Sequence, residues 1–183
     1  KDELKICSNN INLNNTVKEI DRKGYTETFK IDNEILEKIK TEILNNKINI
    51  STKKNINNVD VVKKETENED QYLKRLTNNG ISRVTGVISL QRSQNLKEFV
   101  LSSELIKLVS SYINSKTLSI NVSYFISLPV NTSEKEKFEN AQYFHWDNDF
   151  RKFLKLYIYL TDVNEFSGPH VYVEGSHKHK KFQ

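Results

Sequence analysis

The chain has 183 residues, 36% of them hydrophobic, and a formal net charge of +4 from 28 Lys and Arg against 24 Asp and Glu. This length predicts one domain with a core of its own, no apolar run approaches the roughly twenty residues of a membrane span, and scattered basic residues without interleaved aromatics do not predict nucleic-acid binding. The single cysteine, Cys7, excludes an internal disulfide and favours a reducing compartment, so we expect a cytoplasmic protein.

The first part of the chain, about residues 1–115, is expected to be helical and loop-rich. Residues 25–31 alternate enough for a short strand. Asp32 then offers an N-cap to a predicted helix with one apolar stripe, which consists of Ile35, Leu36, Ile39, Ile43 and Leu44. Residues 45–70 turn to Asn, Lys, Thr and Glu, which predicts a linker or mobile loop. This segment is either a lid over a substrate mouth or a disordered insertion.

A short helix is expected around residues 72–76. Its stop signal is the run Asn78, Asn79 and Gly80. The following stretch, ISRVTGVISL, favours a strand over residues 81–90.

The strongest helical pattern follows Ser102 or Ser103 as the cap and extends to Ile113. Residues 119–130 alternate almost perfectly between apolar and polar side chains, which predicts a half-buried strand. A charged loop is expected from Asn131 to Asn140.

One residue separates His145 from Asp147 in the sequence QYFHWDNDF. At the end of a strand, residues i and i+2 point to the same face roughly 6.6 Å apart, so this imidazole and carboxylate can hold one metal ion. They form two-thirds of the 2-His-1-carboxylate triad, which leaves open positions on Fe(II). Asp149 shares the parity of Asp147 and would support it by hydrogen bonding. Alternatively, His145 is a structural histidine, and Asp147, Asn148 and Asp149 form a turn.

A second alternating stretch, FLKLYIYLTDV, covers residues 153–163 and predicts a strand. One face would carry Leu154, Leu156, Ile158 and Leu160, and the other Phe153, Lys155, Tyr157 and Tyr159. A turn is expected over residues 164–168, followed by an extended stretch that breaks at Gly175.

HWD followed by FLKLYIYLTDVNEFSGPHVYVEGSHK resembles the phytanoyl-CoA dioxygenase family of Fe(II)- and 2-oxoglutarate-dependent oxygenases. The resemblance covers roughly the last forty residues and fades toward the N-terminus. It implies a mainly β fold with flanking helices (α+β), in which a double-stranded β-helix, also called a jelly roll or cupin-like barrel, occupies about residues 116–183 of a single oxygenase domain.

The resemblance also implies roles for particular residues. His145 and Asp147 match the first two iron ligands, and Tyr157 falls near a position that borders the 2-oxoglutarate pocket. Lys155 and Tyr159 would face the same cavity or serve packing alone.

Relatives supply a third ligand, a second His, and an Arg for 2-oxoglutarate from downstream strands, so we expect these residues beyond Gln183. The chain, which opens at Lys1 and contains no Met, is accordingly expected to be a fragment with about half of the barrel. His170 is a less favoured third ligand, as are His177 and His179.

The implied function is hydroxylation of an unactivated C–H bond in a small organic substrate, with Fe(II), 2-oxoglutarate as co-substrate, and dioxygen. The carboxylate of Asp147 favours hydroxylation, because halogenating relatives lack it. Two alternatives stay open: a cupin-like metal-binding protein or isomerase without 2-oxoglutarate chemistry, and a non-catalytic β-roll interaction protein. Neither the substrate nor the oligomeric state follows from the sequence.

Overall fold

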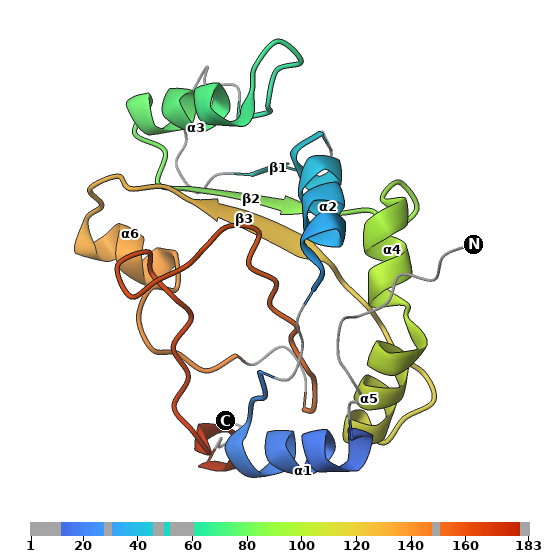
Figure 1. Ribbon diagram of the computed structural model, residues 1–183. Coiled ribbons are helices and arrows are strands. Elements are labelled where there is room, and N and C mark those ends of the chain that lie inside the picture. Colours follow the sequence, from blue (N-terminus) through green and yellow to red (C-terminus); the bar gives the residue numbers. More distant parts are fainter. Residues whose placement is uncertain (1–11, 28–30, 46–49, 52–60, 148–150, 180–183) are drawn as a thin grey trace. The chain divides into compact units, whose positions relative to one another are not determined.

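The computed structural model describes residues 12–27, 31–45, 50–51, 61–147 and 151–179 (Figure 1). The chain divides into two compact units. The first unit contains Lys1–Lys40, Asn95–Ser119 and Trp146–Gln183, and the second contains Thr41–Gln94 and Ile120–His145. Each unit is therefore built from segments that lie far apart in the sequence.

Two helices that the sequence separates by some eighty residues pack together in the first unit. They are α1 (Leu13–Lys23) and α5 (Ser103–Ile113). Asn12 caps α1 by accepting a hydrogen bond from the amide of Asn15 at 3.1 Å, which satisfies one of the N–H groups left over at a helix start. Ile20 of α1 and Leu108 of α5 are buried. Removal of such side chains from water supplies most of the stability of short helices.

The helix predicted after Asp32 is α2 (Asn33–Asn45). The side chain of Asp32 accepts a hydrogen bond from the amide of Glu34 at 2.8 Å, so the expected cap is confirmed. Ile39 and Ile43, from the predicted apolar stripe, are buried. Among the described helices α2 is the longest with 13 residues, and none combines the length and apolar character needed to cross a membrane.

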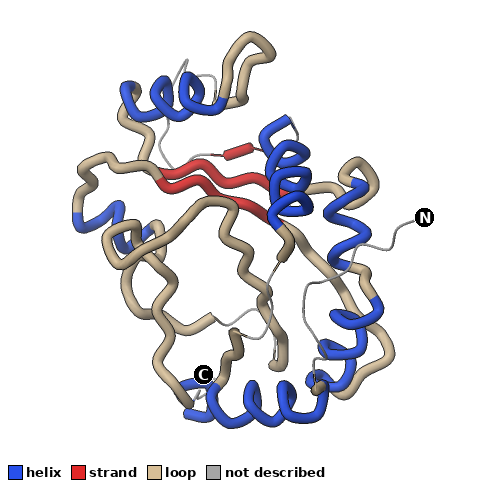
Figure 2. Tube along the Cα trace, viewed as in Figure 1, coloured by secondary structure: helices blue, strands red, loops and turns tan. Residues whose placement is uncertain are grey.

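The second unit contains a three-stranded antiparallel sheet in the order β1-β2-β3 (Figure 2). Its strands are β1 (Ile50–Ser51), β2 (Arg83–Val87) and β3 (Ser123–Ser127). The register of the central pair sets Val84 opposite Ile126. The strands predicted within residues 81–90 and 119–130 are therefore confirmed over the five residues that pair.

One face of this sheet covers the core of the second unit. The core consists of Tyr72, Leu76, Ile81 and Val84, with Leu44, Val61, Leu73, Ile126 and Leu128 packed around them. Tyr72 and Leu76 come from α3 (Glu69–Asn78), whose end before Gly80 agrees with the predicted stop signal. Gly80 has φ +69°, a left-handed backbone that glycine adopts without strain.

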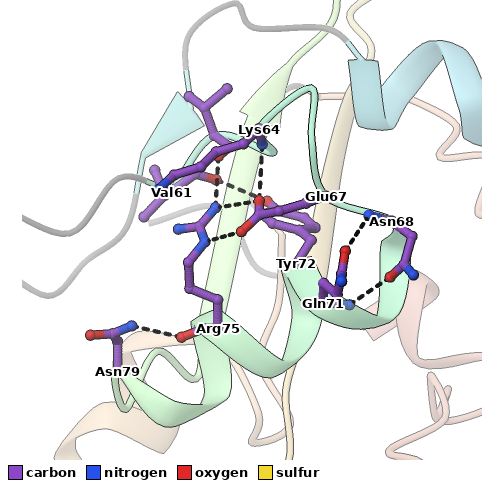
Figure 3. A network of polar contacts seen from close by, with 9 residues as sticks. Val61, Lys64, Glu67, Asn68, Gln71, Tyr72, Arg75 and Asn79 are labelled. Carbon is purple, nitrogen blue, oxygen red and sulfur yellow. Dashed lines mark hydrogen bonds and ion pairs between the residues drawn. The ribbon is translucent and has the colours of Figure 1, made fainter.

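Residues 61–68 precede α3 and are held against it (Figure 3). Glu67 accepts two hydrogen bonds from Arg75, at 2.6 and 2.9 Å, and Arg75 also donates to the carbonyl of Val62. The hydroxyl of Tyr72 donates to the carbonyl of Val61 at 2.9 Å. This stretch, which the composition assigns to a linker or mobile loop, is thus anchored, while residues 46–49 and 52–60 lie outside the described part of the chain.

The predicted fold class, a mainly β double-stranded β-helix, is wrong. The described residues form six α-helices, the remaining two being α4 (Gln94–Val100) and α6 (Glu134–Glu139), and a sheet whose strands have two, five and five residues. The strand predicted over residues 153–163 is also wrong: neither this stretch nor residues 170–173 joins the sheet, and the side chains of residues 170–173 are all exposed. Alternation specifies two faces of a segment, whereas a strand also needs a neighbour for its backbone hydrogen bonds.

Candidate functional site

The segment that carries His145 and Asp147 begins at the end of α6. Ser133 and Glu136 form a capping box at the start of this helix. After the helix Ala141 adopts a left-handed backbone with φ 55°, which turns the chain away. The described residues 142–147 contain neither helix nor strand, so the expected strand before the pair is wrong.

Tyr143 ties this segment back to α6. Its hydroxyl donates a hydrogen bond to the carboxylate of Glu134, and this bond raises the pKa of Tyr143. Lys137, 2.7 Å from the same carboxylate, and the Tyr143 hydroxyl together lower the pKa of Glu134. The sequence did not indicate this anchor, because the partners lie nine positions apart and no motif spans them.

The ring of His145 is oriented by the backbone just before it. Nδ1 lies 2.8 Å from the carbonyl oxygen of Tyr143. Because a carbonyl only accepts hydrogen bonds, Nδ1 carries the proton, and the neutral ring then has its lone pair on Nε2. Histidines that bind metals commonly donate from the other ring nitrogen to a carbonyl in this way. His145 therefore fits the role of a ligand through Nε2.

Asp147 forms an ion pair with another residue that the sequence singled out. Its Oδ2 lies 2.7 Å from Nζ of Lys155, and the two side chains are 36% and 37% exposed. The same ammonium lies 5.5 Å from the centroid of the Phe153 ring, a favourable cation–π distance. A hydrogen-bonded, solvent-accessible carboxylate fits the role of a metal ligand.

Tyr157 and Tyr159 each contact His170. The rings of Tyr157 and His170 stack with centroids 4.4 Å apart and an interplanar angle of 26°. The hydroxyl of Tyr159 accepts a hydrogen bond from the backbone amide of His170 at 2.8 Å. The structure thus brings together the two tyrosines predicted to border the cofactor, and it places His170 with them rather than with the pair Asp147 and Lys155.

His177 has a structural place in the first unit. Its Nε2 donates to the carbonyl of Asp21 at 3.1 Å, and the amide of Gly175 donates to the carbonyl of Lys23 at 2.6 Å. These carbonyls belong to the last turn of α1, which has no partners for them within the helix. The Gly-Ser-His stretch therefore caps α1, a role that its sequence did not indicate.

A complete metal site is not formed within the described residues, because no three His, Cys, Asp or Glu side chains lie close enough together to hold one ion. The division between the units falls between His145 and Trp146, so the surroundings of His145 and of Asp147 are described separately. Their convergence on one ion stays a prediction from their spacing. Asp149 lies outside the described residues.

A pocket of about 330 Å³ lies elsewhere, in the second unit, and is lined by Asn45, Lys63, Lys64 and Glu65. None of the predicted site residues lines it. Comparison with models of protein families, with curated proteins and with solved structures finds no match to this chain. The candidate functional residues are therefore those of residues 142–147 and 151–173, with the contacts given above.

Proposed function

We propose that His145 and Asp147 are two ligands of one metal ion and that the protein is an Fe(II)- and 2-oxoglutarate-dependent dioxygenase acting on a small organic substrate. The observation that carries the proposal is the hydrogen bond from Nδ1 of His145 to the carbonyl of Tyr143 at 2.8 Å. It directs the lone pair of the ring to Nε2, the atom that binds the metal in such sites. The proposal depends on these residues and not on a β-barrel.

The chain supplies a mixed ligand set that suits the proposed ion. One imidazole and one carboxylate, two residues apart, can lie at most about 7 Å apart at their Cα atoms, a separation that one ion can bridge. Imidazole with carboxylate is the ligand combination of non-haem Fe(II) oxygenases. The third ligand is left unassigned, because the described residues contain no cluster of three or more His, Cys, Asp or Glu side chains that could hold a metal ion.

Three further side chains suit a co-substrate with two carboxylates. Lys155, Tyr157 and Tyr159 occupy alternate positions that follow Asp147. An ammonium and two phenol hydroxyls donate hydrogen bonds to carboxylates. We assign these residues to 2-oxoglutarate, whose iron-bound oxidation by dioxygen supplies the chemistry. The protein's part is to hold and orient the reactants and to exclude water.

Calorimetry on the full chain under anaerobic conditions tests the proposal. We expect 2-oxoglutarate to bind only when Fe(II) is present, and His145→Ala and Asp147→Asn to abolish both binding events. Asp162→Asn is the matched control, because Asp162 is an exposed carboxylate in the same segment; this variant should bind as the wild type does.

The outcomes separate the alternatives. Metal binding that needs His145 and Asp147 but no response to 2-oxoglutarate would indicate a metal-binding protein without this chemistry. Metal binding that survives both substitutions, or no metal binding at all, would refute the proposed site.

A further inference from the structure

The ion pair between Lys155 and Asp147 has a consequence for metal binding. Both residues belong to the first unit, so their contact is internal to one compact body. Nζ of Lys155 lies 2.7 Å from Oδ2 of Asp147. The ammonium therefore sits against one of the two oxygens that the proposed site offers to a metal ion.

An ammonium and a divalent cation compete for the same carboxylate. A cation bound to Asp147 would lie roughly 5 Å from the ammonium if the ion pair stayed intact, and the two positive charges repel each other at that distance even in water. By Coulomb's law with a solvent-like dielectric constant, this repulsion would weaken metal binding by about tenfold if the ammonium stayed in place, so displacement of the ammonium is the favoured outcome. The lysine chain is flexible and its end is partly exposed, so the ammonium can move into solvent.

We propose that Lys155 is an electrostatic latch on Asp147, which pairs with the carboxylate in the metal-free protein and is displaced when a divalent cation binds. The inference rests on the proposed function, because it takes Asp147 as a metal ligand. It adds that Lys155 raises the Kd for the metal ion, because each binding event must first break the ion pair.

Lys152 provides a matched control for the charge of Lys155. It lies three residues earlier, in the same unit, and its Nζ is 4.5 Å from the centroid of the Tyr112 ring. Replacement of either lysine by methionine removes one positive charge and keeps a similar length of side chain. Of the two substitutions, only Lys155→Met removes the ammonium that lies 2.7 Å from Oδ2 of Asp147.

Titration of the full chain with Mn²⁺, followed by electron paramagnetic resonance of the free ion, tests the latch. We expect Lys155→Met to lower the Kd for Mn²⁺ by roughly three- to fivefold, the cost of breaking a partly exposed ion pair, and Lys152→Met to change it by less than about twofold.

Two other results would overturn it. If the wild type binds Mn²⁺ through Asp147, as shown by loss of binding in Asp147→Asn, and Lys155→Met binds equally well, the latch is wrong and the proposed site stands. If neither the wild type nor Lys155→Met binds Mn²⁺, both inferences are wrong.

A second measurement uses the wild-type protein alone. Acylation of lysine amines, followed by mass spectrometry, reports how accessible each ammonium is. Saturating Mn²⁺ should raise the labelling rate of Lys155 several-fold and leave that of Lys152 unchanged. An unchanged rate at Lys155 in the metal-loaded protein would show that the ion pair persists, which contradicts displacement.

Discussion

The contact between α1 and the Gly-Ser-His stretch can be tested at Gly24. This residue follows α1 with φ +90°, and a Cβ atom there would lie 2.2 Å from the hydroxyl oxygen of Tyr172 and 2.6 Å from Nδ1 of His177. Carbon atoms in proteins rarely approach other heavy atoms closer than about 3.5 Å. Gly24→Ala must therefore push the segment around Tyr172 and His177 away from the end of the helix.

Two contributions set the expected loss of stability. An alanine with this left-handed backbone costs about 1–2 kcal/mol. Displacement of the segment weakens the hydrogen bonds that Gly175 and His177 donate to the last turn of α1, each worth about 0.5–1.5 kcal/mol net. We therefore expect Gly24→Ala to lower the free energy of unfolding by about 2–5 kcal/mol.

Gly168→Ala separates the two contributions. Gly168 has φ +70°, yet a Cβ atom there would meet no atom within 4 Å. This variant carries the backbone cost alone, about 1–2 kcal/mol. Urea denaturation followed by circular dichroism gives both free energies, and amide hydrogen exchange at Gly175 should be faster in Gly24→Ala only. Equal losses in the two variants, with unchanged exchange at Gly175, would refute the packing of this segment on α1.

Two further predictions concern the second unit. Hydrogen bonds from Arg75 and from the backbone of Lys64 lower the pKa of Glu67 from 4.5 to about 2. The stabilisation from Glu67 is therefore complete above pH 4.5 and is lost as the pH falls toward 2. Glu67→Gln should be less stable than the wild type at neutral pH, and the difference in melting temperature should shrink over this range; a difference independent of pH would contradict the assigned ion pair. Leu76→Ala removes a fully buried side chain from the core and should cost about 2–5 kcal/mol in urea denaturation; a loss below about 1 kcal/mol would contradict the packing of α3 on the sheet.

Local signals in the sequence predicted several elements correctly. The cap at Asp32 and the stripe behind it predicted α2, and the pattern that ends at Ile113 predicted α5. Alternation predicted β3, where Tyr124 is buried and Phe125 is exposed. This strand has five residues rather than twelve, because β2 offers five partners.

Other helices were missed because their sequences are polar. The stretch 131–140 was expected to be a loop, although Ser133 and Glu136 have the spacing of a capping box and do start α6. α1 contains few apolar residues, and its packing against α5 stabilises it. The strand expected over residues 25–31 is absent from its described part, and residues 28–30 lie outside that part.

The candidate site shows where sequence spacing stops being informative. Alternation placed Lys155, Tyr157 and Tyr159 on one face of a strand. In the structure Lys155 pairs with Asp147, whereas both tyrosines contact His170. Alternation failed for the opposite face, where Leu156 is 46% exposed rather than in a core. Burial depends on what covers a segment, and a pattern of two faces does not specify the covering element.

The central claim is that His145 and Asp147 bind one metal ion. A crystal structure of the full chain grown with Mn²⁺, with anomalous scattering to locate the ion, tests it most directly. We predict a single strong peak bonded both to Nε2 of His145 and to a carboxylate oxygen of Asp147, with Nδ1 of His145 still donating to the carbonyl of Tyr143. A peak at other side chains, or these two side chains pointing away from each other with no ion between them, would contradict the account.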